Sequence, residues 1–183
     1  MPKTSVVYHS GYGHTQRVAE AVAEGAAATL IAISSEGDIS EADWATLKDS
    51  AAIIFGTPTY MGGPSWQFKK FADASSKVWM QQGWKDKVFG GFTNSGSLNG
   101  DKHSTLSYLQ VLASQHGGLW VSLGLMPANT LAASRSDINN LGGSMGVLVQ
   151  SPTDAGADAI PQGDIDTALA YGKRVAAIAA RLG

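Results

Sequence analysis

Short clusters of apolar and β-branched residues alternate along this chain with longer stretches in which apolar residues recur every three or four positions. The clusters predict strands, and the longer stretches predict amphipathic helices. The predicted strands lie at 4–8, 30–33, 51–55, 88–92 and 119–123, with residues 147–149 completing the sheet. The predicted helices start at His14, around Trp44, near Phe68, near Leu106 and at Asp164.

This alternation predicts a single doubly wound α/β domain over residues 1–183. Residues 51–55 are apolar throughout, which is typical of a parallel strand covered by helices on both faces. In such a fold the crossovers are right-handed, and ligands bind at the carboxyl ends of the strands. The loops after the first, third and fourth strands lie at that edge, so three separate segments converge on one candidate site.

The end of the chain is less regular than the beginning. Residues 124–146 show weak periodicity, and a stretch of that length without regular structure indicates a functional or interfacial segment. Gly117 can cap the helix that ends at His116, and Asp164 can cap the last helix.

Composition narrows the class of protein. There is no cysteine, so disulfides, zinc-thiolate sites and cysteine nucleophiles are excluded, and redox chemistry must use a cofactor. Thirteen Lys and Arg against 15 Asp and Glu give a net charge of -2 without runs of like charge, which argues against nucleic acid as a partner. Charged residues are only 15% of the chain, which suggests that other subunits cover part of its surface.

The hydropathy pattern also bears on the location of the protein. No apolar run reaches the ~20 residues that a membrane span needs, and no secretory apolar region follows Lys3. We therefore expect no membrane insertion and a cytoplasmic location.

The loop at residues 10–15, Ser-Gly-Tyr-Gly-His-Thr, combines hydroxyls, backbone amides freed by glycine and the start of a helix. That combination suits a phosphate held mainly by neutral donors. The loop lacks the third glycine of the dinucleotide fingerprint and the Gly-Lys-Ser/Thr ending of a Walker A loop. An ordinary capped turn between a strand and a helix is the alternative reading.

Two further loops carry candidate chemistry. Residues 56–64 place Tyr60 and Met61 between backbone-exposing residues, as a flat ring ligand requires, and residues 93–100 supply amide and hydroxyl donors. Each loop alone is also compatible with a rigid turn.

Taken in order, these segments resemble the WrbA family of flavodoxin-like NAD(P)H:quinone oxidoreductases. The resemblance rests on the 10–15, 56–60 and 93–100 loops, on Val78-Trp79-Met80 and on His116-Gly117. It continues through 141–146 and Tyr171-Gly172-Lys173, so it spans nearly the whole chain. It implies a flavodoxin-like, doubly wound, five-stranded parallel sheet of order 2-1-3-4-5 with helices on both faces.

The resemblance also implies an FMN site. Its phosphate end would be formed by Ser10, Gly11, Tyr12, Gly13, His14 and Thr15. The ring would contact Pro58, Thr59, Tyr60, Met61 and Gly62 on one side and Thr93, Asn94, Ser95, Gly96, Ser97, Asn99 and Gly100 on the other. The catalytic roles would fall to Tyr12, beside the nicotinamide, and to His116, which would reach the pyrimidine edge from this chain or from another part of the assembly. Trp79 would roof the substrate pocket.

Some of these residues have a second interpretation. Trp79 also fits the core or an interface, and His116 also fits an interaction with the carbonyls at a helix C-terminus. Tyr60 departs from the family pattern, because relatives carry a basic residue there that would meet the phosphate of a pyridine nucleotide. No spacing of His, Asp or Glu suggests a metal site.

The implied activity is that of an FMN-dependent oxidoreductase that passes two electrons from NADH or NADPH to a quinone or a similar small-molecule acceptor, as a homodimer or homotetramer. Two alternatives come from other classes: a flavodoxin-type electron carrier, which meets protein partners through an acidic surface, and a flavin-binding protein with incidental redox activity. The small net charge and the 124–146 segment favour the enzyme.

Overall fold

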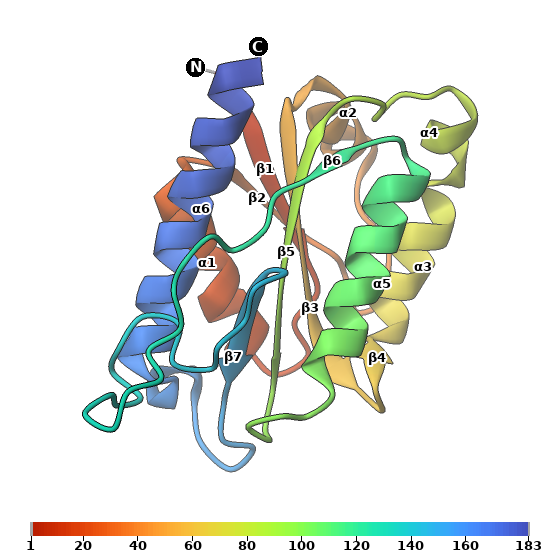
Figure 1. The fold of residues 1–183 in the computed structure, drawn as a ribbon. Helices are drawn as coiled ribbons and strands as arrows, with labels where there is room; N and C mark the ends of the chain where they lie inside the picture. Colours follow the sequence, from red (N-terminus) through yellow and green to blue (C-terminus); the bar gives the residue numbers. More distant parts are fainter. Residues whose placement is uncertain (1, 183) are drawn as a thin grey trace.

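Strands and helices alternate along residues 2–182, the part of the chain that the computed structural model describes (Figure 1). The strands are β1 (Thr4–Tyr8), β2 (Thr29–Ala32), β3 (Ala52–Tyr60), β4 (Gly63–Pro64), β5 (Val88–Ser95), β6 (Leu119–Trp120) and β7 (Val147–Gln150). The helices are α1 (His14–Ala26), α2 (Glu41–Asp49), α3 (Trp66–Ala74), α4 (Ser76–Met80), α5 (Lys102–Gln115) and α6 (Gln162–Leu182), with a short 3₁₀ turn at Ala157–Ala159.

The strands form one sheet in the order β2-β1-β3-β5-β6, and β7 also pairs with β5. These pairings are parallel, whereas the two-residue β4 runs antiparallel to β3. β6 pairs with the start of β5 at Val88 and Phe89, and β7 pairs with its end from Phe92 to Ser95. β6 and β7 are therefore two halves of one fifth strand, and the predicted order 2-1-3-4-5 is confirmed.

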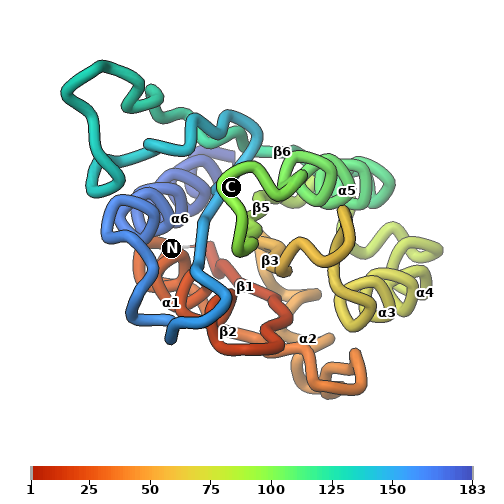
Figure 2. Tube along the Cα trace, turned by 90° about the horizontal axis from the view of Figure 1, so that it is seen from below, coloured from red at the N-terminus to blue at the C-terminus, as the bar shows by residue number. Residues whose placement is uncertain are grey.

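Helices cover both faces of the sheet. Figure 2 shows α1 and α6 on one side and α3 and α5 on the other. The buried apolar residues fall into two clusters, one on each side of the sheet. On the side of α3 and α5, Trp84 is fully buried among Phe55, Phe71 and Phe89.

Two predicted boundaries are wrong near the candidate site. Residues 57–60 were expected in a loop, but they extend β3, and residues 93–95 extend β5. The pairing of β3 with β5 continues to Pro58 and Asn94. The neighbouring strand therefore keeps these residues extended, although the polar residues and the proline locally favour a loop. At the fifth strand, regular pairing stops at Trp120 rather than at 123.

The predicted cap of the last helix is also wrong. α6 begins at Gln162, so Asp164 lies inside its first turn. The buried Asp164 carboxylate accepts a hydrogen bond from the Gln150 amide at 2.9 Å and pairs with the Arg135 guanidinium at 2.6 Å. Burial raises the pKa of Asp164, although both of these partners act in the opposite direction.

α1 and α6 cross at two glycines. A Cβ on Gly25 would lie 2.0 Å from the Leu169 carbonyl oxygen, and a Cβ on Gly172 would lie 2.1 Å from the Val22 carbonyl oxygen. The two backbones therefore pack more closely than any side chain at these positions would allow.

Among residues 2–182, none of the helices has both the length and the apolar character needed to cross a lipid bilayer.

Residues 121–146 leave the sheet between β6 and β7 without forming a helix or strand (Figure 1). The weak periodicity of residues 124–146 predicts this, whereas residues 121–123 were expected to continue the fifth strand. The segment is anchored by Asn139, whose side-chain amide donates to the Leu125 and Gly143 carbonyls at 3.0 Å each and whose backbone amide donates to the Thr167 hydroxyl. Its tip, residues 129–132, is exposed.

Candidate functional site

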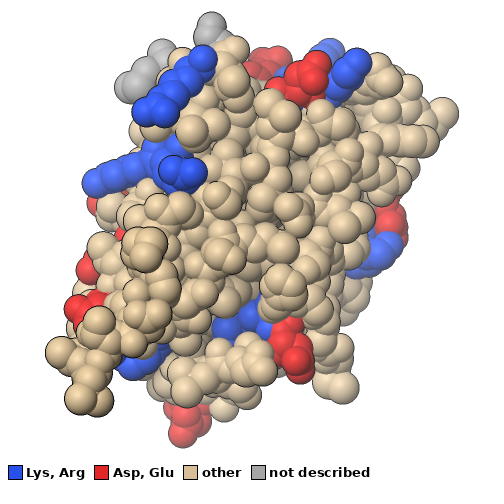
Figure 3. Space-filling model, viewed as in Figure 1, with Lys and Arg blue, Asp and Glu red and all other residues tan. Residues whose placement is uncertain are grey.

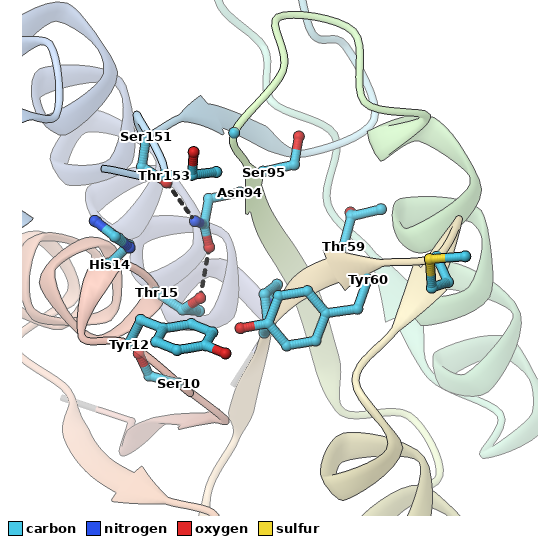
Figure 4. Close-up of a pocket in the computed structure, with 13 residues that line it drawn as sticks. Ser10, Tyr12, His14, Thr15, Thr59, Tyr60, Asn94, Ser95, Ser151 and Thr153 are labelled. Carbon is cyan, nitrogen blue, oxygen red and sulfur yellow. Dashed lines mark hydrogen bonds between the residues drawn. The ribbon is translucent and has the colours of Figure 1, made fainter. Parts of the chain in front are cut away.

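The three predicted loops meet at the carboxyl ends of β1, β3 and β5 around a cavity of about 710 Å³ (Figure 4). This volume falls within the ~300–1,000 Å³ of small-molecule and cofactor pockets. The segment after β7 contributes the remaining wall. The lining residues are Ser10, Tyr12, His14, Thr15, Pro58, Thr59, Tyr60, Met61, Asn94, Ser95, Gly96, Ser151 and Thr153.

Eleven of these thirteen residues are among those that the sequence predicts. The sequence reading missed Ser151 and Thr153, which follow the strand that closes the sheet. The signal was available, because the same rule that points to the carboxyl ends of the earlier strands applies to this one.

One end of the cavity is built from the start of α1. Gly13 precedes the helix with a φ of 89°. The backbone amide of Gly13 donates a hydrogen bond to the Ser10 hydroxyl oxygen at 3.1 Å. The first intrahelical bond of α1 is the one that Arg17 donates to Gly13, so the three amides before Arg17 have no helical acceptor. The first turn of α1 contains no acidic residue. Free amides, a hydroxyl and the positive end of the helix dipole therefore suit a phosphate.

The loops are tied to one another by buried polar side chains. The Thr15 hydroxyl donates to the Asn94 side-chain oxygen at 2.5 Å, and the Asn94 side-chain nitrogen donates to the Ser151 hydroxyl at 2.9 Å (Figure 4). His14 Nε2 donates to the Ala155 carbonyl at 2.9 Å, which leaves only Nδ1 available to a ligand. These hydrogen bonds thus connect the segments that follow β1, β5 and β7.

We expect Asn94→Ala to reduce the free energy of unfolding by about 1–3 kcal/mol, because it leaves the buried hydroxyls of Thr15 and Ser151 without this partner. Urea unfolding followed by circular dichroism would measure the change. Asn129→Ala is the matched control, since Asn129 is exposed, and it should stay within about 0.5 kcal/mol of the parent protein. Equal stability of the two variants would contradict the role of Asn94 as a tie.

The other end of the cavity is aromatic and open to solvent. Figure 4 shows the hydroxyls of Tyr12 and Tyr60 turned toward each other at the mouth. Burial, and secondarily Tyr12, raises the pKa of Tyr60. Tyr12 is 82% exposed, and Met61 projects fully into solvent from a left-handed backbone conformation at the end of β3. This rim offers flat and polarisable surfaces without a fixed charge.

Beneath the rim, the Thr59 hydroxyl lies 2.8 Å from the hydroxyls of both Thr93 and Thr105. Thr93 is completely buried and supports Thr59 instead of lining the pocket. The other predicted cofactor residues that do not line the pocket, besides His116, are Gly11, Gly13, Gly62, Ser97, Asn99 and Gly100.

His9, at the end of β1, is buried behind the first loop. Its Nδ1 has no hydrogen-bond partner among the described residues, and burial lowers the pKa of the imidazole. His9 is therefore neutral near pH 7 and adds no positive charge to the anion site.

The structure places His116 and Trp79 away from this cavity. α5 starts beside the pocket and runs back along the sheet for 14 residues, which puts His116 roughly 20 Å from the start of the helix. There His116 is 5% exposed, its Nε2 lies 2.9 Å from the Ser75 hydroxyl, and its ring packs on Trp84. Both residues line a separate cavity of about 400 Å³. Within one chain, the expectation that they reach the flavin pocket is wrong, because a helix packed antiparallel to the strands ends at the opposite edge of the sheet.

The residues present fit FMN. The amides at the start of α1 and the Ser10 hydroxyl match a phosphate, and the cavity is large enough for a tricyclic ring beside Pro58, Thr59 and Tyr60. The absence of a carboxylate from the cavity lining is consistent with an anionic ligand.

Comparison with known proteins agrees with this fit. Residues 9–130 match the family described as NADPH-dependent FMN reductase. Flavodoxin FldP of Pseudomonas aeruginosa is 63% identical over 182 residues, which cover 100% of this chain and 99% of that protein. An NAD(P)H dehydrogenase (quinone) of Geotalea uraniireducens is 32% identical over 204 residues, covering 98% of each chain.

A solved structure supports the same relationship. The flavodoxin, WrbA-like protein from Agrobacterium tumefaciens superposes with a TM-score of 0.84 at 57% identity, and the match covers 100% of both chains. The resemblance to WrbA and the flavodoxin-like fold are thereby confirmed. The chain belongs to the NADPH-dependent FMN reductase family and, within it, to the FMN-binding, WrbA-type flavodoxin-like proteins.

Proposed function

We propose that this protein is an FMN-dependent oxidoreductase that takes two electrons from NADH or NADPH and passes them to a quinone or a similar small-molecule acceptor. The observation that carries the proposal is the open, uncharged rim at Tyr12, Tyr60 and Met61. A reactant can approach the ring through this rim without displacing a buried side chain.

When bound, FMN supplies the hydride and electron transfer itself. The chain then has to bind and orient it. The start of α1 and Ser10 would hold the phosphate, the Thr15-Asn94-Ser151 hydrogen bonds connect the surrounding loops, and the ends of β3 and β5 would support the ring. The amide and hydroxyl donors of the 93–100 segment would favour negative charge on the ring. Tyr12 and Tyr60 offer flat surfaces against which a nicotinamide or a quinone can pack.

The test is anaerobic reduction followed by turnover. The protein reconstituted with FMN should lose its flavin absorbance when NADH or NADPH is added, and benzoquinone should restore it through repeated cycles. Free FMN at the same concentration is the control for reaction in solution. No bleaching with either nucleotide would refute the enzyme.

A flavodoxin-type carrier is the second candidate, and two observations favour it. The relative FldP is named a flavodoxin. In addition, three exposed carboxylates, those of Asp101, Asp154 and Asp158, lie on the segments after β5 and β7 that border the pocket. A reductive titration that gives two well-separated one-electron steps, together with no turnover of NAD(P)H, would decide for the carrier.

The proposal includes a homodimer or homotetramer in the cytoplasm, where NAD(P)H is available. Figure 3 shows that charged side chains are sparse on the face formed by α5 and the 121–146 segment. Within the sequence of residues 121–146, Arg135 and Asp137 are the only charged residues. Trp79 is 47% exposed at the edge opposite the pocket, so the surface of Trp79 and His116 would meet the pocket of a neighbouring chain, as the family resemblance implies. Light scattering at assay concentration that gives the mass of one chain would contradict this assembly.

A further inference from the structure

Lys102 is the first residue of α5 and is almost completely buried, at 1% exposure. A cation is disfavoured at that end of a helix, because the helix dipole is positive there. Burial also removes the ammonium from water, which is costly unless every donor finds a partner. Its position therefore calls for an explanation other than the stability of α5.

The three donors of the Lys102 ammonium are all used on one short segment. Nζ donates to the Ser95 hydroxyl at 3.0 Å, to the Ser97 carbonyl at 2.6 Å and to the Leu98 carbonyl at 2.9 Å. Ser95 and the following Gly96 line the pocket. The ammonium thus lies directly behind the wall that the 95–98 segment gives to the flavin site.

The backbone between this segment and α5 is shaped to bring Lys102 back to it. Gly100 and Asp101 both have positive φ, of 53° and 51°. A Cβ on Gly100 would lie 2.1 Å from the Ser95 hydroxyl oxygen, so a side chain there would displace the hydroxyl that Lys102 contacts. Left-handed backbone at a non-glycine residue such as Asp101 costs free energy and persists where the surroundings impose it.

The direction of the carbonyls fixes the direction of the amides. In a trans peptide the carbonyl and the amide point in opposite directions. Because the Ser97 and Leu98 carbonyls point at Lys102, the amides of Leu98 and Asn99 point away from it. Neither amide donates to an acceptor within residues 2–182, so both are free for a ligand.

We propose that Lys102 is a positioning residue of the flavin pocket: its buried ammonium holds the 95–98 segment, turns the Leu98 and Asn99 amides outward, and places one positive charge behind the pocket wall. The inference rests on the FMN binding of the proposed function. A cation at this place favours the more negative state of a bound group. Lys102 therefore strengthens FMN binding and raises the midpoint potential of the bound flavin.

The charge on Lys102 is sensitive to pH. Burial lowers the pKa of Lys102 from 10.5 to about 8, with Asp164 on α6 opposing the shift and Arg135 adding to it. As the pH rises through about 8, the native protein loses this proton and one of the three donors. The unfolded chain keeps the proton up to about 10.4, so Lys102 contributes a gain in folding stability between these two values. Flavin affinity should move in the opposite direction over the same range.

The test compares Lys102→Met with Lys102→Arg, which keeps the charge, and with Lys87→Met. Lys87 is the matched control, because its ammonium also donates to two backbone carbonyls, those of Lys48 and Ser50, at the opposite edge of the sheet. Burial lowers its pKa too. Lys87→Met therefore measures the effect of losing a lysine whose only role is to donate hydrogen bonds to backbone carbonyls.

For Lys102→Met we expect at least tenfold weaker FMN binding by calorimetry and faster cleavage within residues 95–101 by limited proteolysis of the flavin-free protein. The midpoint potential of the bound flavin should fall, and a tenfold loss in the preference for the reduced state corresponds to ~30 mV for two electrons. The decrease in affinity of the parent protein above pH 8 should be absent from Lys102→Met. Lys102→Arg should retain most of the affinity and potential.

The inference is overturned if Lys102→Met matches Lys87→Met in affinity, potential and cleavage rate. The proteolysis measurement separates the two proposals, since it needs no flavin. Faster cleavage within residues 95–101 in Lys102→Met supports the positioning role even if the parent protein takes up no FMN, a result that would refute the proposed function alone.

Discussion

Ser10→Ala is expected to weaken FMN binding by about ten- to a hundredfold while leaving riboflavin binding nearly unchanged. The Ser10 hydroxyl oxygen already accepts a hydrogen bond from the Gly13 amide, which leaves its own proton free for a phosphate oxygen. A hydrogen bond to a charged group contributes about 1.5–3 kcal/mol, and each 1.4 kcal/mol is a tenfold change in affinity. Riboflavin lacks the phosphate, so fluorescence titration with both ligands isolates this contact.

The control for this experiment is Ser34→Ala. The Ser34 hydroxyl oxygen likewise accepts hydrogen bonds from loop amides, those of Glu36 and Asp38, but Ser34 lies after β2 and outside the pocket. It tests whether loosening a serine-stabilised turn is enough to reduce affinity. Equal losses of FMN and riboflavin in Ser10→Ala, or a comparable loss in Ser34→Ala, would rule out the phosphate contact.

Gly172→Ala is expected to lower the free energy of unfolding by at least about 2 kcal/mol, even though alanine favours the helix by about 1 kcal/mol at an exposed position. The new methyl group would lie 2.1 Å from the Val22 carbonyl oxygen and 3.0 Å from the Ala26 amide nitrogen. These are backbone atoms, so α1 and α6 must separate to admit it. Urea unfolding gives the change directly.

Gly63→Ala is the reference for this substitution, because no atom lies within 4 Å of a Cβ there and its φ is not positive. The reciprocal contact of Gly25 provides a second check. Once α1 and α6 have separated for one methyl group, the second costs less, so Gly25→Ala and Gly172→Ala together should destabilise the protein by less than the sum of the single changes. Unchanged stability of Gly172→Ala would show that the crossing is not tight.

The fold could be predicted because short apolar clusters alternate regularly with longer segments, of which those of α1, α3 and α6 have a clear apolar face. The prediction failed where a partner strand decides the structure. Residues 57–60 contain Pro58 and two threonines and look like a loop, yet the neighbouring β5 keeps them in the sheet. No local pattern shows which segment will be the partner.

The candidate site was predictable to the extent that its residues follow strands. Lys102 was missed because a lysine at the start of a helix resembles a solvated charge, and only the return of the chain at Gly100 and Asp101 buries it. His116 was assigned to the site from the family resemblance, whereas the direction of α5 takes it to the other edge. The net charge of -2 does not show how charges are distributed, and three carboxylates, those of Asp101, Asp154 and Asp158, lie on the segments that border the pocket.

The fifth strand is divided into β6, which pairs with the start of β5, and β7, which pairs with its end. Because each half is hydrogen-bonded to β5 separately, the length of the excursion between them does not set the register of either pairing. Its exposed tip at 129–132 is consequently a natural place for inserting a reporter domain, because the hydrogen bonds of Asn139 to Leu125 and Gly143 hold the base of the excursion together.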